Sequence, residues 1–327
     1  GTCLVQKTEP MRSASLISTA KWNISLLDDM DHASLFRYFD RHKRPYNPNF
    51  RPDYAAQRNL GSGPMSFNDI DVEEAVIGGV RGEWIRRKRA CDEGRTSQGV
   101  VLFFHGGSFV RGNRSTDRAF CRELALNSSY DVYSTDYALA PEHPFPQGID
   151  DCFNVYKNLC NDLTNGASNI VLCGESAGAT MALAVANYAK RKGIALPKGI
   201  VLISPCVQFE RTLPSHTQNL ETDCMLTNFM EEVLSEYFQT KDPDILKDPL
   251  ASPINGDFIG FPPVYITASD CEVLRDDAVV LHEKMAGLGV DCTLDMAHGL
   301  MHVYPVMTAL AESKAAVRRI CGFFERL

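Results

Sequence analysis

Ser176 stands in the pentapeptide 174–178, GESAG, which has the G-x-S-x-G form of a nucleophile elbow. This sharp turn lifts a serine hydroxyl out of a sheet, and its two glycines are needed because side chains would clash there. The apolar run 169–173 predicts a strand before the turn, and the run 179–186 predicts a helix after it. The hydroxyl of Ser176 is therefore a candidate nucleophile for attack on a carbonyl carbon, with a covalent intermediate.

A serine hydroxyl is inert at neutral pH unless a base lies within hydrogen-bond reach and a third group orients that base. In doubly wound sheets with this elbow, an acid and then a histidine follow the serine, each on a loop after a strand. His302 follows the last predicted strand by a short loop and precedes the final helix, so it is predicted to be the base. The competing candidate is His298, and His302 is preferred because it lies deeper in the loop, after Gly299.

The acid must come from the segment after the predicted strand 264–268, which offers four carboxylates: Asp270, Glu272, Asp276 and Asp277. The last two suit the first turn of the next helix, where negative charge meets the helix dipole. Asp270 and Glu272 remain, and either could accept the imidazole N–H, since glutamate reaches only one methylene further. The residues by themselves leave this choice open.

The segment 105–109, HGGSF, directly follows the predicted strand 100–104. Negative charge that develops on a tetrahedral oxyanion requires N–H donors in fixed positions. The amides of Gly106 and Gly107 can approach closely because no side chain blocks them, and the amide of Ala177 is the third expected donor. His105 is expected to hold this loop rather than to take up protons.

Short apolar runs and helical patterns alternate from about residue 67 onward. Strands are predicted over 100–104, 131–135, 169–173, 199–204, 263–268 and 291–296, and helices over 117–126, 150–160, 180–192, 276–288 and 308–327. Continuous apolar strands separated by helices of this length indicate a mostly parallel central sheet with helices on both faces, an α/β fold.

Two segments fall outside this alternation. Apolar residues recur at helical spacing between 16 and 39, and the Pro-rich connector 44–52 follows. Nearly sixty residues separate the strands ending near 204 and beginning near 263, with a helical pattern over 228–239, and a plain crossover needs far fewer. We therefore expect a helical cap from residues 1–66 and the insertion 207–240, over a core made of 67–206 and 241–327.

Composition narrows the partners and the compartment. A net charge of −8 argues against nucleic acid or an anionic membrane, and the basic run 86–89 is expected to be a solvated strand edge. The 11 cysteines are scattered, as in reduced cytoplasmic proteins. No run of 18 apolar residues predicts a membrane span. No signal peptide is visible, although the chain starts at Gly1.

These motifs together resemble the hormone-sensitive-lipase family of α/β-hydrolase carboxylesterases. The matching stretches, in the family's order, are 105–107, 136–146, 174–178, 248–253, 272–277 and 299–302. The resemblance implies the α/β-hydrolase fold, Ser176 as nucleophile and His302 as base. One branch of the family carries its acid in an E-V-L-x-D-D motif, which 272–277 matches, so the resemblance favours Glu272 over Asp270.

The resemblance further implies a carboxylesterase that acts on small esters with short- or medium-chain acyl groups and needs no metal or organic cofactor. An acyltransferase or amidase with the same triad is the main alternative. A non-catalytic receptor on the same fold is less favoured, because such relatives lose the histidine that His302 supplies. A homodimer is an alternative to a monomer that the sequence leaves open.

Overall fold

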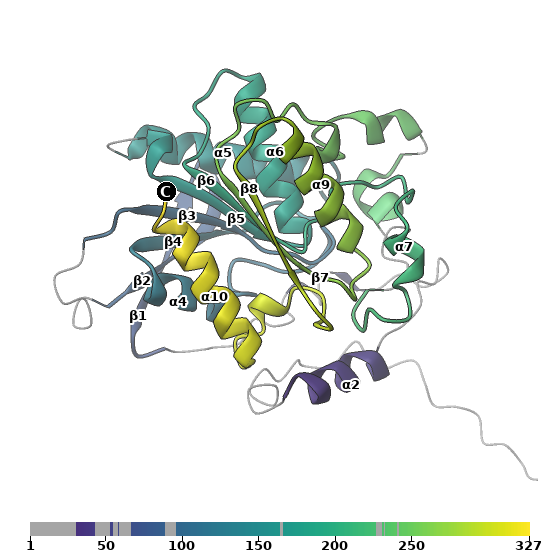
Figure 1. Ribbon diagram of the computed structural model, residues 1–327. Coiled ribbons are helices and arrows are strands. Elements are labelled where there is room, and N and C mark those ends of the chain that lie inside the picture. Colours follow the sequence, from purple (N-terminus) through teal and green to yellow (C-terminus); the bar gives the residue numbers. More distant parts are fainter. Residues whose placement is uncertain are drawn as a thin grey trace, which may run out of the picture.

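The computed structural model describes residues 31–42, 53–54, 58, 67–88, 96–163, 166–226, 231, 233–240 and 242–327. An eight-stranded sheet runs through the centre in the order β1-β2-β4-β3-β5-β6-β7-β8 (Figure 1). The strands are β1 Ile70–Ile77, β2 Val80–Arg87, β3 Gly99–Phe104, β4 Tyr130–Thr135, β5 Ile170–Glu175, β6 Gly199–Ile203, β7 Val264–Ser269 and β8 Cys292–Ala297. The pairings from β4 through β3 to β8 are all parallel. The pairings of β1 with β2 and of β2 with β4 are antiparallel.

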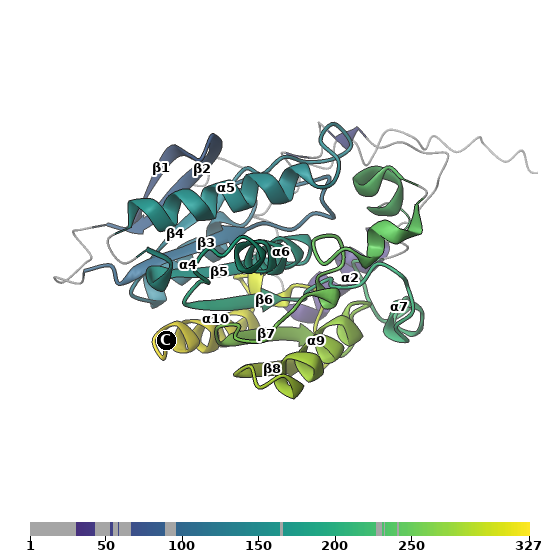
Figure 2. The same ribbon diagram turned by 90° about the horizontal axis from the view of Figure 1, so that it is seen from above.

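Helices cover both faces of this sheet (Figures 1 and 2). The longer helices are α2 His32–His42, α4 Arg118–Asn127, α5 Gln147–Asp162, α6 Ala177–Arg191, α9 Arg275–Gly287 and α10 Ala311–Phe324. Shorter helical turns are α7 Ser215–Gln218, η2 Gly166–Asn169, η3 Val233–Phe238, η4 Pro243–Lys247, η5 Pro253–Asn255 and η6 Tyr304–Val306. Helices α5, α6 and α9 pack on one face, and α4 and α10 on the other.

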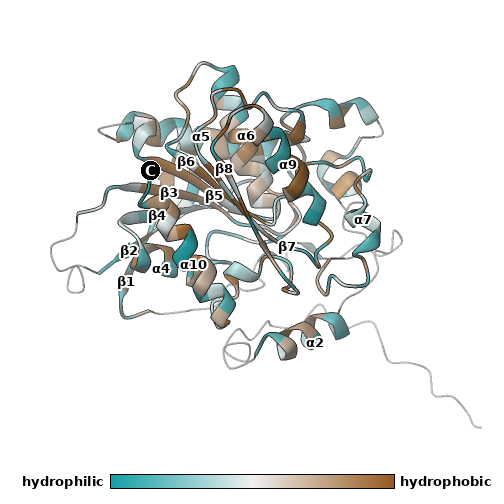
Figure 3. Ribbon diagram, in the orientation of Figure 1, coloured by the Kyte–Doolittle hydropathy of each residue, from teal (hydrophilic) through white to brown (hydrophobic). Residues whose placement is uncertain are grey.

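Strands β3 and β6 have no polar side chain along their whole length, as expected of strands with both faces buried (Figure 3). In β3, Leu102 and Phe104 point into the core under α5 and α6, while Val101 and Phe103 join the core with α4 and α10. This alternation is what a period of two residues requires in a strand. The predicted α/β-hydrolase architecture, with a mostly parallel sheet between two helical layers, is confirmed.

The β1–β2 hairpin was not among the predicted strands. Its residues are largely charged, and β1 forms one edge of the sheet with one side toward solvent, so no apolar run marks it. Arg86 pairs with Glu73 across the hairpin at 2.8 Å and stacks over Trp84. The described part of the basic run 86–89 forms the end of β2 and the residue after it, and its three side chains are half-buried. Because β2 lies between β1 and β4, the run is not at a sheet edge, which differs from the expectation.

The two segments predicted to form the cap are described in part. Helix α2 packs Leu35 and Phe39 against Met301 and Cys224, beside the loop that carries His302. Residues 16–30 of the predicted helix and the whole connector 44–52 lie outside the described residues. Of the helical pattern over 228–239, the described part forms the turn Val233–Phe238.

Candidate active site

Ser176 lies at the tip of the turn between β5 and α6, with φ 53° and ψ −119°, a conformation that ordinary residues avoid. Its amide donates to the carbonyl of Ile203 at 2.8 Å, which fixes the turn to the next strand. A Cβ on Gly178 would lie 1.9 Å from the carbonyl oxygen of Phe104, and one on Gly174 would lie 2.2 Å from that of Gly178. Both glycines of the elbow are therefore required by close backbone packing.

A continuous hydrogen-bonded chain joins Ser176 to Glu272 through His302. His302 Nε2 lies 3.0 Å from Ser176 Oγ, and His302 Nδ1 lies 2.5 Å from Glu272 Oε2. Because a carboxylate only accepts, Nδ1 carries the proton and Nε2 is free to accept from the serine hydroxyl. The structure thus brings together the three residues predicted as nucleophile, base and acid.

The Glu272 carboxylate is held by two more donors. Its Oε1 accepts from the Ser269 amide at 2.6 Å and from the Ser204 hydroxyl at 3.0 Å. The same Ser204 oxygen accepts from the Val303 amide at 3.1 Å, so one hydroxyl touches both the acid and the backbone next to His302. A buried carboxylate needs this number of partners to remain charged.

Burial and charge act in opposite directions on the histidine. Burial alone would lower the pKa of His302, but the hydrogen bond and the charge of Glu272 raise it above its ordinary value. Burial raises the pKa of Glu272, and the hydrogen bond and charge of His302 offset part of that rise. Both side chains are closed off from solvent, since His302 is 3% and Glu272 0% exposed. The acid therefore favours the imidazolium that must form when the serine gives up its proton.

Asp270 and His298, the alternative candidates for acid and base, contact each other and not Ser176. His298 Nδ1 is 2.5 Å from Asp270 Oδ2, and the Gly299 amide donates to Asp270 Oδ1 at 2.9 Å. The His298 side chain is exposed. Neither residue contacts the hydrogen-bonded chain from Ser176 to Glu272.

Asp276 and Asp277 have the structural role predicted for the first turn of α9. Asp276 accepts from the Ser215 amide at 2.8 Å. Asp277 is fully buried, accepts from the Val207 amide at 2.8 Å and lies 2.5 Å from His216 Nε2. The two carboxylates tie the segment after β6 to α9, and with it the acid loop.

One of the three predicted oxyanion donors is corrected. The Gly106 amide donates to the Glu175 carboxyl, so its N–H is committed to a side chain and is not free for substrate. The amides of Gly107 and Ala177 donate to no protein group within the described residues. Gly107 has φ 109°, where glycine is favoured, and Ala177 directly follows Ser176.

His105 holds the oxyanion loop, as the sequence predicted. It is fully buried, stacks on Tyr137 with 4.4 Å between ring centroids, and its Nδ1 lies 2.7 Å from the Gly106 carbonyl. Burial lowers the pKa of His105 to about 4, so the ring is neutral at physiological pH.

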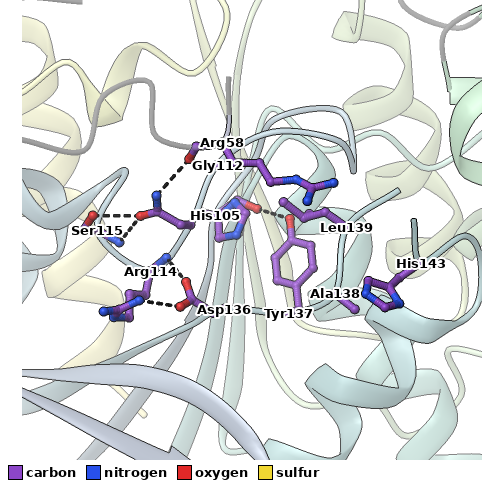
Figure 4. A pocket seen from close by; sticks show the side chains of 11 residues that line it. Arg58, His105, Gly112, Arg114, Ser115, Asp136, Tyr137, Ala138, Leu139 and His143 are labelled. Atoms are coloured by element: carbon purple, nitrogen blue, oxygen red, sulfur yellow. Dashed lines mark hydrogen bonds and ion pairs between the residues drawn. The ribbon is translucent and has the colours of Figure 1, made fainter. Parts of the chain in front are cut away.

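A pocket of about 510 Å³ opens beside this loop (Figure 4). It is lined by Arg58, His105, Gly112, Asn113, Arg114, Ser115, Asp136, Tyr137, Ala138, Leu139 and His143. Two of its cations are already paired, Arg58 with Glu142 and Arg114 with Asp136. None of the triad residues lines it, so the pocket is separate from the reacting groups.

Three residues at the site were not singled out by sequence reasoning: Ser204, Ser269 and Glu175. Ser204 and Ser269 stand at the carboxyl ends of β6 and β7, where side chains of a parallel sheet reach the site. Glu175 is an acidic residue inside the elbow, directly before the nucleophile. The signal available in the sequence was this acidic side chain at the end of an apolar strand, a position that the fold buries.

The described ranges contain neither a metal-binding cluster nor a membrane-spanning helix. No group of three or more His, Cys, Asp or Glu side chains there is arranged to hold a metal ion. No helix in the same part of the chain is long and apolar enough to cross a membrane. No disulfide bond joins two cysteines of these ranges.

Comparison with known proteins supports the fold and the class of enzyme. A family model described as alpha/beta hydrolase fold matches residues 101–306. An esterase of Acinetobacter venetianus is 30% identical over 257 residues, which cover 78% of this chain and 82% of that protein. An acetyl-hydrolase of Streptomyces hygroscopicus is 32% identical, with 80% and 85% covered. The crystal structure of an esterase from the bacterial hormone-sensitive lipase family has a TM-score of 0.79 and 29% identity, with 93% and 97% covered.

The fold and site define an enzyme of the α/β-hydrolase class, a serine ester hydrolase. Within that class, the chain belongs to the hormone-sensitive-lipase family of carboxylesterases. The expected family and enzyme class are thus confirmed. The alternatives of an acyltransferase or amidase and of a non-catalytic receptor are not favoured by these likenesses.

Proposed function

We propose that this enzyme hydrolyses small carboxylic esters with short- or medium-chain acyl groups, using Ser176 as nucleophile, His302 as base and Glu272 as acid. The observation that carries the proposal is the hydrogen-bonded chain from Ser176 Oγ through both nitrogens of His302 to Glu272. The imidazole ring of His302 already has the orientation needed to take the proton from Ser176 Oγ, so the ring does not have to rotate before the reaction.

The reaction follows from this geometry in two halves. Ser176 Oγ attacks the ester carbonyl carbon while His302 Nε2 takes its proton, and Glu272 stabilises the imidazolium. The carbonyl oxygen becomes an oxyanion, for which the amides of Gly107 and Ala177 are the proposed donors. His302 then gives its proton to the leaving alkoxide, so that the alcohol departs and an acyl group remains on Ser176.

Deacylation reverses the roles with water in place of the alcohol. Water attacks the acyl carbonyl as His302 Nε2 takes a proton from it, and the same donors hold the second oxyanion. The proton returns to Ser176 Oγ as the carboxylic acid leaves. The Ser176 proton leaves with the alcohol and a proton from water replaces it, with His302 carrying both, and none of the steps calls for a cofactor.

The proposed preference for short and medium acyl chains is based on similarity to known esterases and not on the shape of an acyl-binding pocket. A similar protein is named an acetyl-hydrolase, which supports a short acyl group. The test is the rate of p-nitrophenyl ester hydrolysis across acyl lengths, with Ser176→Ala as the control. We expect kcat/KM to be highest for short and medium acyl chains. Hydrolysis that survives in Ser176→Ala would overturn the mechanism, whereas a maximum at long chains would overturn only the acyl preference.

The proposed cap comprises residues 1–66 and the insertion 207–240, over a core of 67–206 and 241–327. Packing of α2 on Met301, next to His302, supports a role for the N-terminal part in covering the site. Deletion of residues 1–42 is expected to change the acyl-length profile more than the rate on the acetyl ester. An unchanged profile would contradict this role of the N-terminal part.

We also propose a cytoplasmic location, which is supported by the lack of a disulfide bond between cysteines of the described ranges, because disulfides are rare in reducing compartments. Cell fractionation tests it. A homodimer is the assembly we propose to test by light scattering on the purified protein.

A further inference from the structure

Glu175 lies beneath the oxyanion loop. Its side chain is almost fully buried, and its Oε1 accepts the Gly106 N–H. A Cβ on Gly106 would lie 2.1 Å from that oxygen, so only glycine leaves room for the contact. The peptide that follows carries the Gly107 N–H, one of the proposed oxyanion donors. The position of this donor therefore depends on where the Glu175 carboxyl sits.

A second buried carboxyl meets Glu175 from another part of the chain. Asp117, the residue before α4, forms a side-chain hydrogen bond with Glu175. Its Oδ2 is buried and accepts no hydrogen bond from any donor among the described residues. Two carboxylates can hydrogen-bond to each other only if one of them keeps a proton. The contact thus requires a shared proton.

No cation among the described residues acts on these two carboxyls. Arg118, the nearest guanidinium along the chain, is engaged with Glu83 through two hydrogen bonds of 2.7 Å. Burial raises the pKa of the Cys121 and Cys173 thiols and of the Tyr137 hydroxyl, all of which face the pair, so these groups are neutral. Full ionisation of both carboxyls would therefore be uncompensated.

Burial also sets the direction in which the two carboxyls titrate. It raises the pKa of Asp117 to about 7 and holds the pKa of Glu175 well above its ordinary value. The proximity of Asp117 raises the pKa of Glu175 further. At neutral pH the pair retains at least one proton.

We propose that Glu175 and Asp117 form a proton-sharing carboxyl pair that positions the oxyanion loop, with Glu175 holding the Gly106 amide and Asp117 holding Glu175. This inference rests on the proposed function, because it gives the loop its role as oxyanion donor. Both are positioning residues, since they act through the Gly106–Gly107 peptide and do not touch the substrate. Loss of the shared proton would leave two repelling anions behind a site that must accept negative charge.

The first test separates positioning from packing. In Glu175→Ala the Gly106 amide loses its acceptor, and we expect kcat at neutral pH to fall about 100-fold with KM changed by less than about threefold, since a misplaced oxyanion donor costs about that much. In Glu175→Gln the amide oxygen accepts from Gly106 and its NH₂ donates to Asp117. We therefore expect this variant to recover most of the lost kcat. An unchanged kcat in Glu175→Ala would overturn the positioning role.

The second test addresses the shared proton through the pH profile of kcat. We expect wild-type kcat to fall on the alkaline side as the last proton leaves the pair. Glu175→Gln and Asp117→Asn each leave only one ionisable carboxyl, so both are expected to lack that fall. The matched control is Asp295→Asn, which changes a carboxyl that is paired with Arg319. Asp295 lies in the edge strand β8, so this variant should keep the wild-type pH profile. An alkaline fall that persists in both amide variants, or is absent in the wild type, would overturn the proposal.

These outcomes are distinct from failure of the proposed function. Stoichiometric labelling by a fluorophosphonate reports whether Ser176 and His302 are still competent in each variant, and circular dichroism reports the fold. Wild-type protein that is not labelled would contradict the mechanism itself. Wild-type protein that is labelled and active, with the same pH profile as Glu175→Gln, would contradict only the carboxyl pair. If Glu175→Ala fails to fold, the two amide variants still decide the outcome.

Discussion

Asp270 and His298 are bound to each other: His298 Nδ1 lies 2.5 Å from Asp270 Oδ2 at the outer rim of the acid loop. Glu272, two residues after Asp270, and His302, four residues after His298, make the equivalent contact in a buried position. The loops after β7 and β8 thus carry two carboxylate–histidine pairs side by side. Only the inner pair reaches Ser176, since its histidine has its second nitrogen 3.0 Å from the serine hydroxyl.

Amide substitution should distinguish the two pairs. Glu272→Gln removes the charge that stabilises the imidazolium and favours the wrong ring tautomer, so we expect kcat to fall about 10³- to 10⁴-fold. Asp270→Asn alters an exposed pair, whose contribution is small, and should change kcat by less than about threefold. Rates on p-nitrophenyl butyrate measure both. A larger loss in Asp270→Asn would assign the acid to Asp270 instead.

The pH dependence of kcat/KM should report His302. The reaction needs the neutral imidazole, and the pKa of His302 is raised above its ordinary value because Glu272 outweighs burial. As pH falls through that raised pKa, the base becomes protonated, so activity should be lost with a midpoint above about 6.5. In Glu272→Gln the charge of Glu272 is lost and burial is opposed chiefly by the charge of Asp223, so the midpoint of the residual activity should move to lower pH. A midpoint that stays in place would show that another group controls the acid limb.

Ser204 should act as a positioning residue for the triad. Its hydroxyl donates to Glu272 and accepts from the Val303 amide, and Ser204→Ala removes both contacts without changing the backbone. We expect kcat to fall about tenfold, because two buried groups lose a partner, with KM little changed. Steady-state kinetics test this. Ser204→Cys, which keeps a weak donor, should lose less, and equal losses in both variants would indicate a packing effect.

The same glycine-to-alanine change should have opposite effects at two positions. A Cβ on Gly178 would overlap the Phe104 carbonyl, so Gly178→Ala should lower the free energy of unfolding by about 3 kcal/mol or more. Gly322 lies in α10 with open space around it, and Gly322→Ala should raise that free energy by about 0.5–1 kcal/mol. Denaturant unfolding measures both. Stabilisation by Gly178→Ala would mean that the elbow is packed more loosely than the structure indicates.

Much of the architecture could be predicted because local patterns encode it. The apolar runs that became β3, β5 and β6 are buried on both faces, so their composition alone distinguishes them from surface strands. The hairpin β1–β2 could not be found in this way. Charged residues interrupt both strands, and Arg86 pairs with Glu73 across them, so neither strand contains a continuous apolar run.

By itself the sequence determined the elbow, the order of nucleophile, acid and base, and the choice of His302 over His298, since these depend on motif and on position after a strand. Tertiary structure decided what depends on direction. Asp270 and Glu272 are two residues apart in one loop, and spacing does not say which of them turns inward to His302 and which outward to His298. Nor does it say that the Gly106 amide faces Glu175, because that contact joins atoms 69 residues apart. Hydrogen bonds depend on where a lone pair and an N–H meet in space, and only the packed sheet fixes that.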